Sequence, residues 1–214
     1  MVDWYPKLMM WYRDAHKEKG YTITEQSKEY IIFPESFYKR TEKLCHEKIY
    51  DYCFIGSLKI DDSTIKNRSW ILDFINKKFT EKSYLQFTDS KTKQNYQPKG
   101  SYDYTMMNDG LVPKETPNLE DRNIFDEKYY KNICQSKFCL CPAGDSLWSM
   151  RFYEAIMCKT IPIVSCVKET YRSPEESLIG YKYYLTSETD FVYREDWVLH
   201  NYNLFLQYHT LEKR

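Results

Sequence analysis

The chain has 214 residues and a mass of 26.0 kDa, a size that suits one α/β domain. Its 31 Lys and Arg residues balance its 31 Asp and Glu residues, which argues against a nucleic-acid backbone or an acidic lipid surface as partner. A hydrophobic fraction of 42% argues against a disordered chain.

Hydrophobic periodicity predicts alternating strands and helices along the chain. Helices are predicted over residues 6–18, 36–47, 67–79, 126–135, 148–158, 175–179 and 194–209. Strands are predicted over residues 29–33, 52–56, 84–87, 137–141, 161–165 and 182–185, with polar connections over 59–66, 88–122 and 143–147. Short apolar strands between helices indicate a parallel sheet covered on both faces, so we expect a Rossmann-like α/β fold in a single domain over 1–214.

The seven cysteines show neither a C-x-x-C pair nor a zinc-ligand spacing, and most lie within apolar runs. We therefore expect reduced thiols and a cytoplasmic location. Residues 1–10 carry charges at Asp3 and Lys7, unlike a signal peptide. No window of about 18 apolar residues predicts a membrane span.

Residues 138–154 predict a corner in which a strand, a loop and a helix follow one another. Ligands of open α/β sheets bind at the carboxyl ends of strands, beside helix N-termini. Gly144 would allow close backbone approach, and Ser146 or Ser149 could cap the helix. The free N–H groups of its first turn would then form an anion site.

The helix after this corner is apolar around most of its circumference, which is typical of a buried helix. Arg151, Glu154 and Cys158 share one narrow arc. One interpretation is an i,i+3 ion pair worth about 0.2–0.5 kcal/mol. We favour a ligand site, because the arc lies one to two turns from the anion-binding N-terminus. Arg151 could neutralise phosphate oxygens and Glu154 could accept hydrogen bonds from ribose hydroxyls, as in a nucleotide site.

The same residues resemble the exostosin-like glycosyltransferases (family 47). The resemblance rests on Ser136-Lys-Phe-Cys-Leu-Cys-Pro-Ala-Gly144, on Ser149-Met-Arg-Phe-Tyr-Glu-Ala-Ile156 and on Ile161-Pro-Ile-Val164. Upstream, Phe54-Ile55-Gly56 with Arg68 and Leu72 is similar to the family's glycine-bearing strand and arginine-led helix. The run from Gly144 through Trp148 and Ser149 to Arg151 also resembles the protein O-glucosyltransferases and capsule xylosyltransferases (family 90).

The resemblance implies the donor-binding half of a GT-B glycosyltransferase that inverts the anomeric centre and uses a UDP-sugar. It implies that Arg151 binds the donor diphosphate, that Glu154 binds the ribose, and that Ser149 and Arg68 contact phosphate. Residues 49–214 would form the donor-binding core, and the helices and strand of 1–48 a candidate acceptor side. Usual members have two Rossmann-like halves, and this chain has the length for little more than one. A short member encoded by a large DNA virus would fit.

No Asp-x-Asp pair occurs, so we expect neither a metal nor a bound cofactor, and expect Arg and a helix terminus to stabilise the leaving group. Inversion needs a general base. Asp145 is the first candidate, although it could equally be a helix-capping carboxylate, and His16 is a weaker alternative. Asp14, Asp61, Asp62 and Asp103 have no stronger claim. Trp148 is a candidate for stacking on the base or sugar.

The sequence thus predicts an inverting glycosyltransferase that transfers a sugar, with xylose as first guess, from a UDP-sugar to a glycan or protein acceptor. The alternative is a non-catalytic domain that binds a nucleotide sugar or glycan, which the short length would suit. The expected partners are a nucleotide sugar and a glycan or glycoprotein acceptor, without nucleic acid or a membrane span. A homodimer is an assembly that the sequence leaves open.

Overall fold

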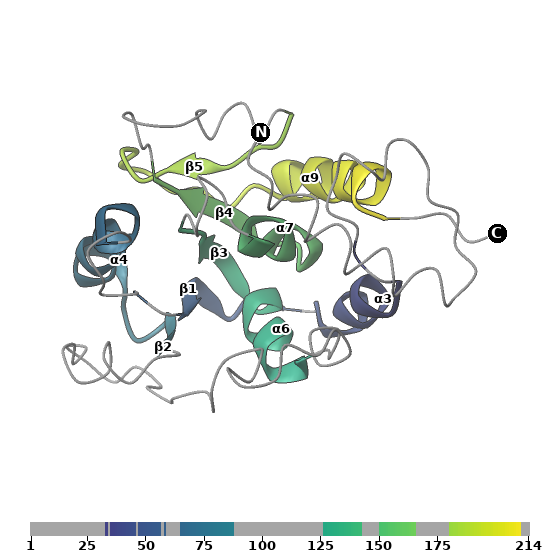
Figure 1. The fold of residues 1–214 in the computed structure, drawn as a ribbon, viewed down its shortest axis with the longest axis horizontal. Coiled ribbons are helices and arrows are strands. Elements are labelled where there is room, and N and C mark those ends of the chain that lie inside the picture. Colours follow the sequence, from purple (N-terminus) through teal and green to yellow (C-terminus); the bar gives the residue numbers. More distant parts are fainter. Residues whose placement is uncertain are drawn as a thin grey trace.

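The structure is a computed structural model that describes residues 33, 35–45, 47–56, 58, 65–87, 126–142, 150–165 and 180–210. Five strands form one parallel sheet in the order β2-β1-β3-β4-β5 (Figure 1). The strands are β1 (Tyr50–Gly56), β2 (Tyr84–Phe87), β3 (Ser136–Leu140), β4 (Ile161–Val164) and β5 (Tyr184–Leu185). The helices are α3 (Glu35–Leu44), α4 (Ile65–Lys78), α6 (Glu127–Cys134), α7 (Met150–Met157) and α9 (Glu195–Tyr208).

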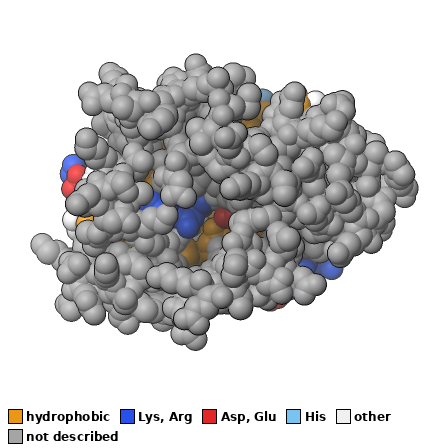
Figure 2. Space-filling model, viewed as in Figure 1, with side chains coloured by type: hydrophobic (Ala, Val, Ile, Leu, Met, Phe, Trp, Pro, Cys, Tyr) orange, Lys and Arg blue, Asp and Glu red, His pale blue; other side chains and the backbone are white. Residues whose placement is uncertain are grey.

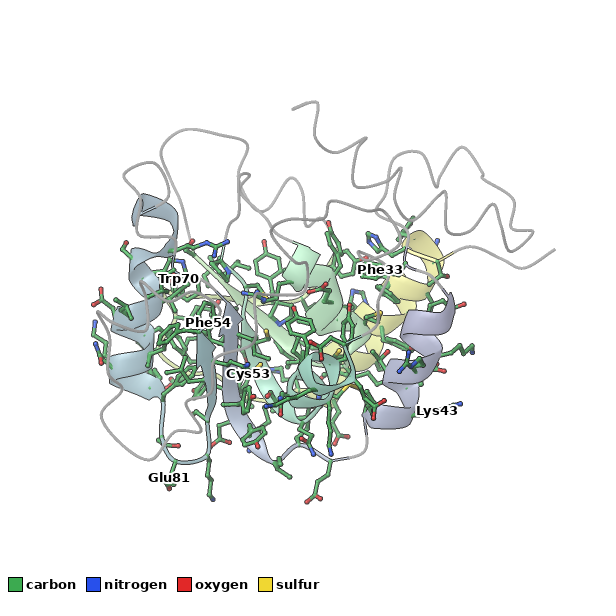
Figure 3. The ribbon with its side chains drawn as sticks, turned by 60° about the horizontal axis from the view of Figure 1, so that its bottom comes forward. Phe33, Lys43, Cys53, Phe54, Trp70 and Glu81 are labelled. Atoms are coloured by element: carbon green, nitrogen blue, oxygen red, sulfur yellow. A yellow bond between two sulfur atoms is a disulfide. The ribbon has the colours of Figure 1, made fainter. Side chains whose placement is uncertain are left out.

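Both faces of the sheet are covered, as the apolar strands predict. Successive side chains of a strand point to opposite faces, so Phe54 of β1 packs with α4 while Cys53 and Ile55 pack with α3, α6, α7 and α9. Figure 3 shows Phe54 and Trp70 on the side of α4. The predicted Rossmann-like α/β fold is confirmed.

The predicted elements are found wherever the structure describes them. β2 has the predicted bounds, and the other described strands and helices lie within a few residues of theirs. The predicted helices 6–18 and 175–179 lie outside the described residues, as does the strand 29–33 apart from Phe33. In the described ranges, no helix combines the length and the apolar character that crossing a membrane requires.

Helix α3 packs into the same core as the rest of the domain. The rings of Phe33 and Phe205 lie 5.3 Å apart, and the hydroxyl of Tyr202 donates a hydrogen bond of 2.8 Å to Glu42. The described part of the N-terminal segment therefore shares a core with the sheet. The division between 1–48 and 49–214 stays a prediction.

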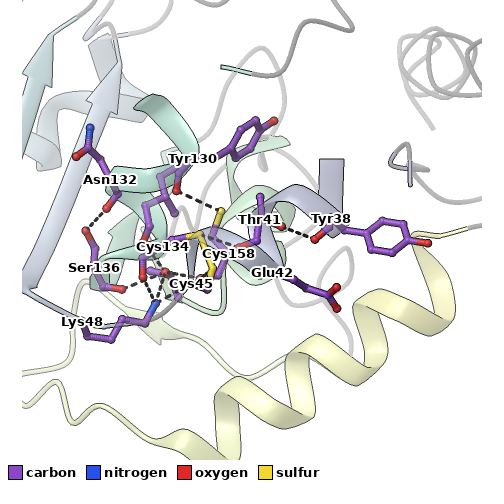
Figure 4. The surroundings of a disulfide bond; sticks show 12 residues. Tyr38, Thr41, Glu42, Cys45, Lys48, Tyr130, Asn132, Cys134, Ser136 and Cys158 are labelled. Carbon is purple, nitrogen blue, oxygen red and sulfur yellow. Dashed lines mark hydrogen bonds between the residues drawn. A yellow bond between two sulfur atoms is a disulfide. The ribbon is translucent and has the colours of Figure 1, made fainter. Parts of the chain in front are cut away.

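Cys45 and Cys134 form a disulfide that ties the end of α3 to the last residue of α6 (Figure 4). The prediction of reduced thiols is wrong for this pair. Its members are 89 residues apart, so only the docking of α3 on α6 brings them together, and no local spacing signals it. Four further cysteines are free and buried: Cys53, Cys139, Cys141 and Cys158.

Lys48 lies beside this disulfide and binds the C-terminal ends of two helices (Figure 4). Its ammonium donates to the carbonyl oxygens of Cys134 at 2.7 Å and Cys158 at 3.4 Å, and to the hydroxyl of Thr160 at 3.0 Å. A cation is favourable at helix C-termini because of their partial negative charge. Burial nevertheless lowers the pKa of Lys48 to about 8. Lys48 therefore joins the C-terminal ends of α6 and α7, and the disulfide joins the end of α6 to the end of α3.

Candidate functional site

The strand order creates one point where the chain connections diverge. From β1 the chain passes to β2 on one side, whereas β3, β4 and β5 follow in order on the other. In sheets of this order, ligands bind in the crevice at the carboxyl ends of the first and third strands. Here those ends are Gly56 and Leu140, with α4 on one face and α7 on the other.

Arg151, in the first turn of α7, reaches across to the end of β1. A Cβ atom at position 56 would lie 2.9 Å from both Nη1 and Nη2 of Arg151, so the guanidinium rests against the backbone of Gly56. Its Cζ also lies 5.5 Å from the ring centroid of Phe54. The glycine therefore leaves the space that the guanidinium fills, and this places a positive charge at the point where ligands bind.

A tyrosine hydroxyl connects this arginine to Glu154, one turn further along α7. Nε of Arg151 donates to the hydroxyl of Tyr129 over 3.5 Å, and that hydroxyl donates to Oε2 of Glu154 at 2.5 Å. The hydroxyl of Tyr130 lies 3.5 Å from Oε1. Among the described side chains, the ion pairs within 4.0 Å do not include one between Arg151 and Glu154. The i,i+3 ion pair is therefore not formed, and the Tyr129 phenol lies between the two groups instead.

Burial governs the ionisation of these three groups. It raises the pKa of Glu154, although Tyr129, Arg151 and Tyr130 favour the carboxylate, and it raises the pKa of Tyr129 well above its ordinary value. Burial alone would lower the pKa of Arg151, but Tyr129, Cys139 and Glu154 favour the guanidinium and keep that pKa above its ordinary value. Buried groups with perturbed pKa values at a sheet crevice are typical of a functional site.

The remaining candidates are placed as follows. Arg68 is partly buried in the first turn of α4, the helix that follows β1, so the topology brings it to the same edge of the sheet as Arg151. The structure does not describe the other candidates, which are His16, Gly144, Asp145, Ser146, Trp148, Ser149, Asp14, Asp61, Asp62 and Asp103.

Among the described residues, no group of three or more His, Cys, Asp or Glu side chains lies close enough together to hold a metal ion. Figure 2 shows Lys or Arg and Asp or Glu side chains meeting hydrophobic ones at the floor of a hollow in this face.

Tyr129 and the close contact at Gly56 are the features that the sequence did not reveal. Tyr129 lies on the apolar side of a predicted helix and is only 2% exposed. A buried tyrosine hydroxyl usually has a hydrogen-bond partner, so a tyrosine on the apolar side of this helix signals that a polar group faces α6. Nothing in the spacing of the residues identified Glu154 as that group.

A doubly wound parallel sheet defines an α/β protein of the Rossmann-like class, in which ligands bind at the crevice beside the switch point. Residues 57–187 match the Exostosin GT47 domain, and the chain belongs to this glycosyltransferase family. Family membership implies a sugar donor and an acceptor. The match confirms the predicted resemblance. A search of curated proteins gave no match.

Proposed function

We propose that this protein is an inverting glycosyltransferase that takes its sugar from a UDP-sugar and transfers it to a glycan or protein acceptor. Family membership supports the reaction class, and one observation supports the site: the guanidinium of Arg151 lies against Gly56 at the switch point of the sheet. Arg151 would bind the donor diphosphate and Glu154 the ribose. Arg68 would be a second phosphate ligand.

The reaction needs a hydroxyl oxygen of the acceptor to attack the anomeric carbon while the bond from that carbon to the diphosphate oxygen breaks. A general base takes the hydroxyl proton, and UDP leaves with the bonding electron pair. The planar fork of Arg151 suits diphosphate oxygens, where it would stabilise the charge that develops on departure. Asp145 stays the first candidate for the base and His16 the alternative, and xylose stays the first guess for the sugar.

The disulfide bears on the compartment in which the protein works. A cytoplasmic location stays a prediction. The Cys45–Cys134 disulfide favours an oxidising compartment instead, because glutathione and thioredoxin keep cytoplasmic thiols reduced.

The test is a panel of UDP, GDP, ADP and NAD scored by thermal unfolding. A ligand at about 100 times its Kd stabilises a protein by roughly 2.7 kcal/mol, and we expect the largest shift with UDP. Arg151→Ala should reduce the shift strongly and Arg151→Lys should reduce it less, because Lys keeps the charge and loses the fork.

Arg194→Ala is the matched control, since Arg194 is exposed and stacks on Trp197 as Arg151 stacks on Phe54. It should leave the UDP shift unchanged. Equal shifts with all four nucleotides would reduce the site to a generic phosphate site. UDP binding without transfer to any acceptor in a glycan panel would favour the non-catalytic alternative.

A further inference from the structure

The Tyr129 hydroxyl lies between the two charged groups of the candidate donor site and contacts both of them. It is buried between Oε2 of Glu154 at 2.5 Å and Nε of Arg151 at 3.5 Å, and it belongs to α6 whereas both partners belong to α7. We propose that Tyr129 is a positioning residue, which sets the orientation of the Glu154 carboxylate and the Arg151 guanidinium for binding the nucleotide. The proposal rests on the proposed function.

The direction of the hydrogen bonds follows from the chemistry of the three groups. The guanidinium can only donate, and the ionised carboxylate can only accept. The phenol has one proton, so it must give that proton to Glu154 and accept from Arg151. The two charges are thereby linked without forming an ion pair with each other. Among the described residues, Arg151 makes its hydrogen bond to Tyr129 through Nε, and its outer nitrogens, Nη1 and Nη2, lie toward Gly56.

Helix α6 holds the phenol in place at both of its ends. At its start, Asp126 caps the helix by accepting a hydrogen bond of 2.9 Å from the backbone N–H of Tyr129. At its end, Cys134 is joined to Cys45 and its carbonyl oxygen accepts from Lys48. The hydroxyl position is therefore set by the scaffold, and not by the flexible carboxylate that it orients.

The titratable groups that face Glu154 in the described part of the chain are Tyr129 and Tyr130 from α6, Arg151 from α7, and Cys158 directly after α7. Tyr129 is the group that donates the short hydrogen bond, and this bond favours the ionised carboxyl. Without it, the carboxyl should take up a proton at a higher pH. A loss of the Tyr129 hydroxyl should therefore appear both in UDP affinity and in its dependence on pH.

The experiment measures the Kd of UDP by calorimetry between pH 6 and pH 8.5 for the full chain and its variants. Tyr129→Phe should weaken binding about tenfold at pH 7, or about 1.4 kcal/mol, and the loss should grow as the pH falls. Adding Glu154→Gln to Tyr129→Phe should remove the new pH dependence, because the titrating carboxyl is gone. A purely structural role of the tyrosine would not produce a pH dependence that a second substitution removes.

Tyr202→Phe is the matched control, because the Tyr202 hydroxyl also donates to a carboxylate, that of Glu42, at 2.8 Å between α9 and α3. It should lower the unfolding temperature and leave UDP affinity and its pH profile unchanged. The proposal is overturned if Tyr129→Phe binds UDP as the parent chain does while Arg151→Ala and Glu154→Gln weaken binding. If those two variants also bind normally, the proposed donor site fails as well.

Discussion

Replacing Gly56 with alanine should impair the site while sparing the fold. The new Cβ would lie 2.9 Å from Nη1 and Nη2 of Arg151, whereas ordinary contacts begin near 3.4 Å, so the guanidinium must move by about 0.5 Å. Gly56 ends strand β1 and does not have the positive φ that disfavours an L side chain. Among the described glycines, Gly180 is the one with a positive φ. An alanine should therefore fit the backbone.

The two consequences differ in sign. Replacing glycine by alanine inside a strand gains about 0.5–1 kcal/mol, because the unfolded chain has less freedom to lose, so the unfolding temperature should be unchanged or higher. Hydrogen bonds to charged groups contribute about 1.5–3 kcal/mol, so displacement of the guanidinium should weaken UDP binding roughly ten- to a hundredfold. Calorimetric titration with UDP and thermal unfolding measure the two effects separately.

A double-mutant cycle with Arg151→Ala isolates the contact. If Gly56 acts by leaving space for the guanidinium, Gly56→Ala should have no further effect on UDP affinity once Arg151 is alanine. An equal loss of affinity in both backgrounds would show that Gly56 acts independently of Arg151, and the reasoning would be refuted.

Three further outcomes are expected. Lys48→Met should cost progressively more stability as the pH rises from about 7.5 to 9.5. Lys48 loses its proton near pH 8 in the folded chain but only near pH 10.5 in the unfolded chain, so deprotonation stabilises the folded parent by up to about 3 kcal/mol. Parallel curves of unfolding free energy against pH for parent and variant would contradict this. The Cys45–Cys134 bond closes a long loop, so its reduction, or its removal by Cys45→Ser together with Cys134→Ser, should lower the free energy of unfolding by about 2–4 kcal/mol. Alkylation of both residues in the unfolded, unreduced protein would show that the bond is not formed. EDTA should leave UDP binding and transfer intact, and complete loss restored by Mn²⁺ would overturn the metal-free mechanism.

The fold followed from the sequence because its signals are local. The strand Tyr84–Phe87 and the helices around Ile71 and Ile156 are marked by runs and spacings of apolar side chains within one element. The same local arithmetic places Arg151 and Glu154 on one side of α7. Each of these inferences needs only the geometry of a single helix or strand.

The contacts that build the site depend on how separate elements dock. Tyr129 and Glu154 are 25 residues apart, and Lys48 and Thr160 are 112 residues apart. Such pairs require the angle and register of α6 against α7, which hydrophobic periodicity does not encode. The disulfide escapes prediction for the same reason, since its cysteines are 89 residues apart, whereas an ion pair between Arg151 and Glu154 is suggested by their spacing of three residues on one helix.

The four free thiols in the core give this protein an internal reporter of its own opening. Cys53, Cys139 and Cys158 are at most 1% exposed and Cys141 is 3% exposed, and burial raises the pKa of Cys53 and Cys158 well above its ordinary value. Native thiols so placed do not react with an alkylating reagent, whereas the same residues react once the chain opens. The rate at which each thiol is modified therefore measures how often the surrounding region opens. Since Cys53 and Cys139 lie on neighbouring central strands and Cys158 follows α7, a mass-resolved labelling experiment would separate local opening of the helix at the candidate donor site from global unfolding of the sheet.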